Sequence, residues 1–254
     1  MGKIFAIVNQ KGGVGKTTTV INLGYALHSR GKRVLMCDCD PQGNCTSGLG
    51  VNKSTKPNVY DVIVNARNPK DAVIKTQFGN LLPASMELSG ASVELVEMTN
   101  REYRLKKALD NIRDFYDYIF IDCPPSLELL TINALVAADR LIVPVQCEYF
   151  AMEGLSDLMS TIRMTNVSLN PRLDVEGVIL TMHDPRTKLS EQVAAEINKF
   201  FGDKVYPTPV PRNVRISEAP SHGLPVSVYD RSSKGSKAYL RLASEFLKRE
   251  RENG

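Results

Sequence analysis

Residues 9–18 read N-Q-K-G-G-V-G-K-T-T, and they lie between an apolar run at residues 4–8 and a segment whose apolar residues recur at helical spacing. A strand, a glycine-rich loop and a helix in this order are the setting in which such a loop binds phosphate. Glycines allow the backbone to close around an anion, and the first N–H groups of the following helix point toward it. The sequence therefore predicts a phosphate-binding loop formed by Gly12, Gly13, Val14, Gly15, Lys16, Thr17 and Thr18.

Two side chains of this loop have the chemistry that phosphoryl transfer requires. Lys16 would place a positive charge on the β- and γ-phosphate oxygens, and the hydroxyl of Thr17 would bind Mg²⁺. The alternative is a glycine-rich turn that only begins a helix. The offsets of the glycines, the lysine and the threonine favour the phosphate site, with Lys16 as a catalytic residue and Thr17 as a metal ligand.

A second lysine, Lys11, stands at the entrance of the loop, although a plain phosphate loop needs only the later one. The pattern K-G-G-x-G-K-[ST] defines the deviant Walker A group, and in this stretch the chain resembles the ParA/Soj/MinD ATPases. In that family the early lysine reaches across a dimer interface to the partner's nucleotide. The resemblance therefore implies an ATP-dependent homodimer in which Lys11 binds ATP and takes part in catalysis. The alternative is a solvated loop lysine.

The length and charge of the chain limit its class. At 254 residues, one α/β domain over residues 1–254 is expected. The 32 basic and 28 acidic residues leave a net charge of +4, which is too small to indicate nucleic-acid binding by itself. Residues 211–241 hold six basic and two acidic residues, so this segment carries the whole excess and the rest of the chain is neutral.

The five cysteines are odd in number, which argues against a disulfide framework and for a reducing cytosol. Cys37 and Cys39 alternate along one predicted strand and Cys45 is predicted on a loop; we expect small buried apolar residues rather than zinc ligands. Met1-Gly2-Lys3 leads directly into a predicted strand, so no signal peptide is expected, and no apolar stretch approaches the length of a membrane span. We therefore expect a cytoplasmic protein.

Hydrophobic periodicity predicts alternating strands and helices. Strands are predicted at residues 3–8, 33–38, 81–83, 118–122, 141–145, 175–181 and 205–206. Helices are predicted at residues 16–30, 59–64, 71–75, 88–96, 101–112, 127–138, 152–166, 191–201 and 232–251, and a surface loop at residues 41–55. This alternation indicates a mostly parallel twisted sheet with helices on both faces, as in the single-domain P-loop NTPase fold. Ligands bind at the carboxyl ends of such strands, where Asp38, Asp40 and Asp122 also lie.

These three aspartates follow two predicted strands. Residues 37–42 read C-D-C-D-P-Q, and family resemblance implies that Asp40 positions the attacking water while Asp38 lies near the metal. The alternative is an aspartate pair that caps a turn. Asp122 ends the apolar strand Y-I-F-I-D before C-P-P-S, a Walker B pattern that holds Mg²⁺. Thr17, Asp38 and Asp122 are therefore the predicted metal residues.

Two further groups of residues owe their predicted roles to the resemblance. It implies that Pro211 and Asn213 of P-R-N-V-R contact adenine, and an asparagine amide can pair with an adenine edge. The alternative is a surface turn. The resemblance also points to Arg186 of D-P-R-T and to Arg215 as contacts to double-stranded DNA, which would neutralise backbone phosphates without reading sequence. The alternative is ordinary solvated arginines.

The resemblance extends nearly end to end, through K-G-G-V-G-K-T-T, D-P-Q-G-N, D-C-P-P-S, P-V-Q-C-E-Y and P-R-N-V-R-I-S-E-A-P-S-H-G. It implies a bacterial ParA/Soj-type partition ATPase with slow intrinsic turnover. Its ATP-bound dimer would hold nucleoid DNA nonspecifically, and a ParB/Spo0J-like partner would stimulate hydrolysis and return monomers.

Two other classes share parts of this pattern. A MinD-like membrane-associated regulator needs an amphipathic C-terminal tail, whereas residues 246–252 have mixed charge and few apolar residues. A reductase that resembles the nitrogenase iron protein needs a thiolate cluster, and Cys123 and Cys147 lie instead in motifs typical of partition proteins.

Overall fold

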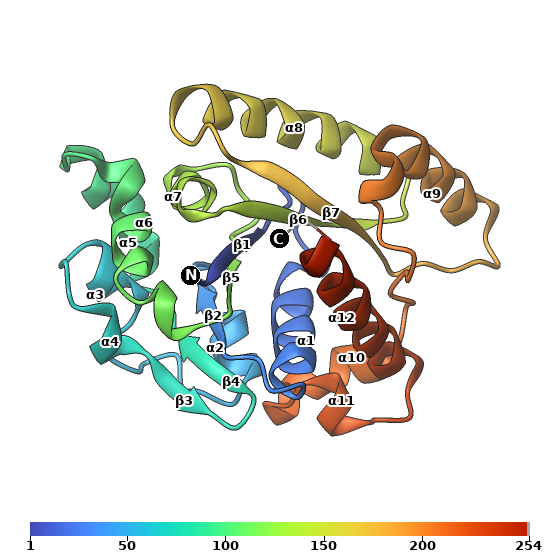
Figure 1. The fold of residues 1–254 in the computed structure, drawn as a ribbon, viewed down its shortest axis with the longest axis horizontal. Helices are drawn as coiled ribbons and strands as arrows, with labels where there is room; N and C mark the ends of the chain where they lie inside the picture. Colours follow the sequence, from blue (N-terminus) through green and yellow to red (C-terminus); the bar gives the residue numbers. More distant parts are fainter. Residues whose placement is uncertain (253–254) are drawn as a thin grey trace.

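The computed structural model describes residues 1–252, and a seven-stranded sheet in the order β3-β4-β2-β5-β1-β6-β7 forms its centre (Figure 1). Every pairing is parallel except that of β3 with β4, which is antiparallel at one edge. The predicted α/β P-loop NTPase fold is confirmed. The strands are β1 (Lys3–Ile7), β2 (Val34–Asp38), β3 (Ile74–Thr76), β4 (Gly79–Leu82), β5 (Tyr118–Asp122), β6 (Arg140–Gln146) and β7 (Asp174–Thr181).

Helices cover both faces of this sheet. In Figure 1, α7 and α8 lie on one side of β6 and β7, and α1 and α12 lie on the other. The helices are α1 (Lys16–His28), α2 (Asn44–Gly48), α3 (Val59–Ile63), α4 (Pro69–Ala72), α5 (Leu88–Glu94), α6 (Arg104–Asp110), α7 (Leu129–Ala137), α8 (Ala151–Ser168), α9 (Lys188–Phe201), α10 (Val214–Glu218), α11 (Val226–Tyr229) and α12 (Lys234–Glu252). None of the helices within residues 1–252 has the length and apolar content needed to cross a membrane.

Side chains of the central strand β1 divide the core into two parts. Ile4 and Ala6 pack toward α6, α7 and α8, whereas Phe5 and Ile7 pack toward α1 and α12. Successive side chains of a strand point to opposite faces, so a strand that is apolar at every position must be covered on both. Phe246 of α12 contacts Phe5 with ring centroids 5.0 Å apart, which fixes the last helix to the centre of the sheet.

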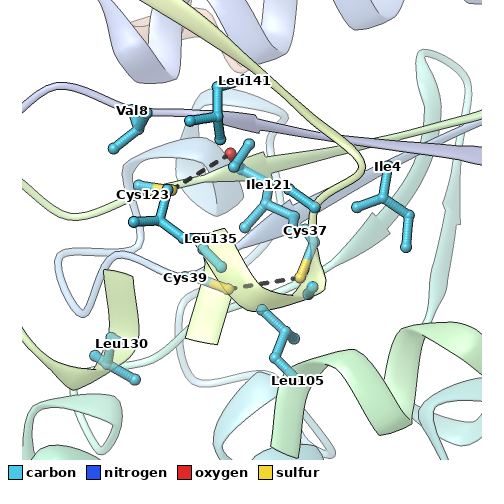
Figure 2. Close-up of a cluster of buried hydrophobic side chains, with 14 of the residues drawn as sticks. Ile4, Val8, Cys37, Cys39, Leu105, Ile121, Cys123, Leu130, Leu135 and Leu141 are labelled. Carbon is cyan, nitrogen blue, oxygen red and sulfur yellow. Dashed lines mark hydrogen bonds between the residues drawn. The ribbon is translucent and has the colours of Figure 1, made fainter. Parts of the chain in front are cut away.

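The five cysteines are all buried and free, as predicted. In Figure 2, Cys37, Cys39 and Cys123 lie among aliphatic side chains of the strands and of α7, and the Cys37 and Cys39 sulfurs are 3.7 Å apart. The hydrogen bond to Cys37 and burial raise the pKa of the Cys39 thiol, and burial raises that of Cys123. These thiols therefore behave as small apolar residues.

Three local predictions were wrong. Residues 41–55 are not a plain surface loop, because α2 forms there and carries buried Cys45 and Thr46. The helix predicted at residues 71–75 is α4, which ends at Ala72 and gives way to strand β3. The strand predicted at residues 205–206 is reduced to one bridge between Val178 and Val205. In each case contacts with distant segments override a weak local preference.

Candidate functional site

The phosphate loop connects β1 to α1. Gly13 and Gly15 have φ of 75° and 96°, in the left-handed region that favours glycine, and Gly15 stands at the start of α1. Gly12 is not among the glycines with positive φ. No side chain caps the first turn of α1, which leaves its N–H groups available to an anion.

Two neighbouring strands hold the loop in place. Asn9 donates from Nδ2 to the carbonyl oxygen of Pro144 in β6 at 2.8 Å, and its Oδ1 accepts from the N–H of Lys11 at 3.0 Å. The hydroxyl of Thr181, at the end of β7, donates to the carbonyl oxygen of Val14 at 2.8 Å. The loop is therefore fixed to the sheet before any ligand binds.

Lys16 lies inside this loop and is buried. Its Nζ donates to the carbonyl oxygen of Lys11 at 2.7 Å. Burial lowers the pKa of Lys16, and the negative charges of Asp122 and Asp40 partly oppose this shift. The predicted catalytic lysine is thus largely removed from water, and its ammonium would interact strongly with the anion of a ligand in this loop.

Asp38 and Asp122 are neighbours in the sheet, since they are paired at the ends of β2 and β5, and both are fully buried. Oδ2 of Asp38 accepts from the N–H of Thr46 at 2.8 Å and from its hydroxyl at 2.6 Å, and Oδ1 accepts from the N–H of Asp40 at 3.2 Å. Burial raises the pKa of Asp38 to about 6, although the hydrogen bonds from Thr46 lower it. Asp38 therefore anchors the segment that carries Asp40.

Asp122 differs from Asp38 because neither of its carboxylate oxygens has a hydrogen-bond partner of normal geometry. Burial, and next the charge of Asp38, raise its pKa well above the ordinary value, while the nearby hydroxyl of Thr17 lowers it. A buried carboxylate without partners is costly, and carboxylate and hydroxyl oxygens are the ligands that Mg²⁺ prefers. Thr17 and Asp122 therefore fit the predicted magnesium site.

These groups open into a cavity of about 420 Å³. Gly12, Gly13, Gly15, Lys16, Thr17, Thr18 and Asp40 all line it, so the predicted phosphate and water-positioning residues come together. A second pocket of about 380 Å³ is lined by Pro211 and Asn213 and shares Gly15, Thr18, Met182 and Pro220 with the first. The two pockets therefore adjoin at these four residues, and the predicted adenine residues lie beside the phosphate loop.

Several residues of this cavity were missing from the sequence-based prediction. They are Ile21, Asn22, Gln42, Asn44, Ser47, Pro125, Met182, Pro220 and Leu224. Gln42 and Asn44 belong to the quoted motif D-P-Q-G-N, and Met182 directly follows a strand's carboxyl end, so position could have indicated these three. Pro125 and Pro220 belong to two other quoted motifs and had the same signal. The remaining cavity residues carry none, because only the fold brings them to the loop; they are Ile21, Asn22, Ser47 and Leu224.

The side chain of Lys11 packs against α8 of its own chain. Its Nζ is 5.5 Å from the ring centroid of Phe150, and its aliphatic part runs past Gly154 of α8. Phe150 and the adjacent Tyr149 are exposed, with 59% and 75% of their surfaces accessible. The ammonium is thus held by a weak cation–π contact.

The two predicted DNA contacts lie outside the cavity. Arg186 donates from Nε and Nη2 to the carboxylate of Asp184 at 2.8 and 2.7 Å, and its side chain is 87% exposed. Arg215 pairs with Glu218 at 2.8 Å and lies 3.5 Å from Asp230. Both guanidinium groups therefore have acidic partners on their own chain.

Known proteins share this arrangement. A family model described as AAA domain matches residues 2–175. The chain is 56% identical to the sporulation initiation inhibitor protein Soj of Bacillus subtilis, over 96% of this chain and 98% of that protein. It is 54% identical to the chromosome partitioning protein ParA of Caulobacter vibrioides, over 98% of this chain and 96% of the relative. The chain belongs to the ParA/Soj family.

Solved structures agree with this assignment. Cobyrinic acid a,c-diamide synthase from Mycobacterium smegmatis, with bound ADP and magnesium, has a TM-score of 0.88 and 37% identity, and the match covers 100% of this chain and 97% of that one. The cell division ATPase MinD of Pyrococcus furiosus has a TM-score of 0.79 and 29% identity, over 98% and 99% of the two chains. MinD is more distant than the ParA/Soj relatives, which favours the partition interpretation over a MinD-like regulator.

Proposed function

We propose that this ParA/Soj family member is an ATPase that partitions bacterial chromosomes or plasmids, and that it acts in the cytoplasm on nucleoid DNA. The observation that carries the proposal is that two pockets adjoin at the phosphate loop, with Lys16 lining the one and Asn213 lining the other. The names of its relatives Soj and ParA support the same role.

Hydrolysis would depend on residues that line the cavity and on two buried aspartates behind its wall. Lys16 would exchange the carbonyl oxygen of Lys11, now 2.7 Å away, for phosphate oxygens. Thr17 and Asp122 would hold Mg²⁺, with Asp38 behind them, and the ion would neutralise charge on the phosphates. Asp40 would orient the attacking water through its carboxylate, which now accepts only from the N–H of Gln42 at 2.9 Å.

Lys11 would act in a partner subunit. Its contact with Phe150 is worth about 0.5–1 kcal/mol if it resembles other exposed cation–π pairs, so little opposes its release. When Lys16 turns to phosphate, it also leaves the carbonyl oxygen of Lys11. ATP binding would thereby free both the side chain and the backbone of Lys11 to reach the nucleotide of a second copy across an ATP-dependent homodimer.

The dimer would double the number of arginines that face DNA. Arg186 and Arg215 would exchange their acidic partners for backbone phosphates, and contact by two copies at once would raise affinity steeply. A ParB/Spo0J-like protein would stimulate the slow intrinsic hydrolysis and return monomers that leave DNA.

Retention on an immobilised duplex of arbitrary sequence tests this cycle. The experiment compares ATP, ADP and no nucleotide over a range of salt concentrations. We expect retention with ATP alone and a steep loss of binding with salt. Equal retention in all three nucleotide states would contradict the proposal, and so would the absence of binding heat when Mg-ATP is titrated into the folded protein.

A further inference from the structure

A third cavity lies among α3, α4 and α6, apart from the two pockets of the nucleotide site. Its volume is about 530 Å³, and it shares no lining residue with the two nucleotide pockets. This volume falls within the range of about 300–1,000 Å³ that is usual for small-molecule sites. The partition cycle proposed above gives this cavity no role.

The polar wall of the cavity is strongly positive. It contains Arg67, Lys70, Arg104 and Lys107, and no acidic residue lines it. Arg67 has a carboxylate nearby, that of Asp71 at 3.5 Å, but both side chains are more than half exposed. An exposed ion pair of this kind contributes little free energy, so most of the positive charge of Arg67 stays available to a ligand.

Two cations beside the cavity pair with a carboxylate, whereas two lysines that line it do not. Lys106, next to Lys107 on α6, pairs with Asp110 at 3.0 Å, and Arg113 pairs with the same carboxylate at 3.2 Å. Within residues 1–252, Lys70 and Lys107 have no carboxylate within 4.0 Å. Lys70 Nζ lies instead 4.5 Å from the ring centroid of Phe115.

Arg104 gives the wall a fixed geometry. Its Nε donates to the carbonyl oxygen of Ile63 at 2.8 Å and its Nη2 to that of Val64 at 3.1 Å, at the end of α3. These bonds hold the guanidinium in one orientation without neutralising its charge. A ligand therefore meets one cation that is already ordered, which reduces the entropy lost on binding.

Besides the four cations, the wall contains the polar residues Asn68 and Asn111 and an apolar part. Val62, Pro69 and Ala108 are buried and line the same cavity. A cation-lined rim over an apolar base suits a small molecule with an anionic group and a ring, more than the flat, continuous contact that a DNA backbone makes. We propose that this cavity binds a small phosphate monoester, with its phosphate at Lys70, Arg104 and Lys107 and its organic part against Val62, Pro69 and Ala108.

Calorimetry on the full-length protein tests the proposal. The phosphate loop is first filled with saturating Mg-ADP, and uridine 5′-monophosphate or inorganic phosphate is then titrated. We expect the ester to bind, and to bind more tightly than inorganic phosphate because only the ester covers the apolar base. The double variant K70Q/K107Q should weaken ester binding at least tenfold, whereas K70R/K107R should retain it.

Lys106→Gln is the matched control, because Lys106 is the neighbour of Lys107 on α6 but pairs with Asp110 and does not line the cavity. This variant should bind the ester as the wild type does, and every variant should keep its affinity for ADP. Absence of ester binding to ADP-loaded wild type would overturn the proposal. Equal ester affinity in K70Q/K107Q would also overturn it, as would a loss of duplex DNA retention in that variant without any ester binding to the wild type.

Discussion

Thr46 gives two hydrogen bonds to one carboxylate oxygen of Asp38, from its N–H at 2.8 Å and from its hydroxyl at 2.6 Å. The same hydroxyl accepts a bond of 2.9 Å from the N–H of Ala84, which follows β4. One buried side chain thus connects β2, α2 and the chain beyond β4. It also fixes the segment from which Asp40 projects into the nucleotide cavity.

Replacing this hydroxyl should therefore affect both stability and hydrolysis. Thr46→Val keeps the shape but leaves Asp38 and the N–H of Ala84 with unmet hydrogen-bonding capacity, at a cost of about 1–3 kcal/mol. We expect a lower melting temperature and, because Asp40 loses its support, slower ATP hydrolysis with ATP still bound. Thr55→Val is the control, since the Thr55 hydroxyl bonds only to Asn52 in the same segment. Unchanged melting and turnover in Thr46→Val would contradict this role.

Asp122→Asn should stabilise the nucleotide-free protein, because it removes a buried charge whose oxygens have no partners. The gain, about 1–3 kcal/mol, corresponds to a rise in melting temperature of roughly 2–12 °C for a chain of this size. The same variant should bind Mg-ATP more weakly than the wild type does. Thermal melting with and without Mg-ATP measures both effects. A fall in the melting temperature of the nucleotide-free variant would argue against a free-energy cost of the buried Asp122 carboxylate.

The stabilisation by Asp122→Asn should also depend on pH. Burial raises the pKa of Asp122, so the folded wild type resists ionisation, whereas the unfolded chain ionises near pH 4. The wild type therefore loses stability as pH rises from the unfolded pKa to the folded one, and the loss is complete above it. The difference between variant and wild type should vanish below the unfolded pKa and grow as pH rises toward the folded pKa. A pH-independent difference would contradict this assignment.

Asp40→Ala should separate binding from hydrolysis. Asp40 lines the cavity but bonds only to the nearby N–H of Gln42 through its side chain, so its loss leaves the phosphate loop intact. We expect the variant to bind ATP, to dimerise and to stay on DNA without release. Phosphate release and duplex retention, measured together, test this. Hydrolysis at the wild-type rate would show that Asp40 does not position water.

Arg186 should bind DNA more strongly once its own acid is removed. Because Asp184 now accepts two hydrogen bonds from it, Asp184→Asn should free the guanidinium and raise DNA affinity, and Arg186→Glu should lower it. Removing one arginine that binds a backbone phosphate should reduce the slope of log affinity against log salt by about 1. Arg163→Glu, a change of equal charge at an exposed position on α8, is the control. Equal effects at Arg163 and Arg186 would indicate net charge rather than a direct interaction with DNA.

The sequence predicted the central sheet well, and the residues predicted for the phosphate loop do lie together, because both depend on local signals. The glycine spacing around Lys16 and the apolar strand before Asp122 each imply one structure at short range. The α2 helix was not predicted, because Asn44–Gly48 is polar and contains glycine. The helix forms where Thr46 donates a hydrogen bond to Asp38. Strand β3 escaped for a similar reason, since only pairing with β4 holds three residues extended.

Other residues around the two pockets also depend on the fold rather than on local sequence. Pro211 and Asn213 were predicted through family resemblance to contact adenine, and the structure places both in a pocket that adjoins the phosphate loop. Asn22 could not be identified in this way. Its Oδ1 accepts from the N–H of Val226 at 2.7 Å, a contact across 204 positions that joins α1 to α11. Such a pairing exists only after folding.

The unpartnered carboxylate of Asp122 also has a consequence for the lifetime of the protein in a cell. Since the empty fold contains a buried carboxyl group without hydrogen-bond partners, bound nucleotide and metal should protect the chain against transient opening. Proteases sample open chains, so copies without ligand should be degraded faster than loaded ones. The abundance of this protein would then follow the energy charge of its host.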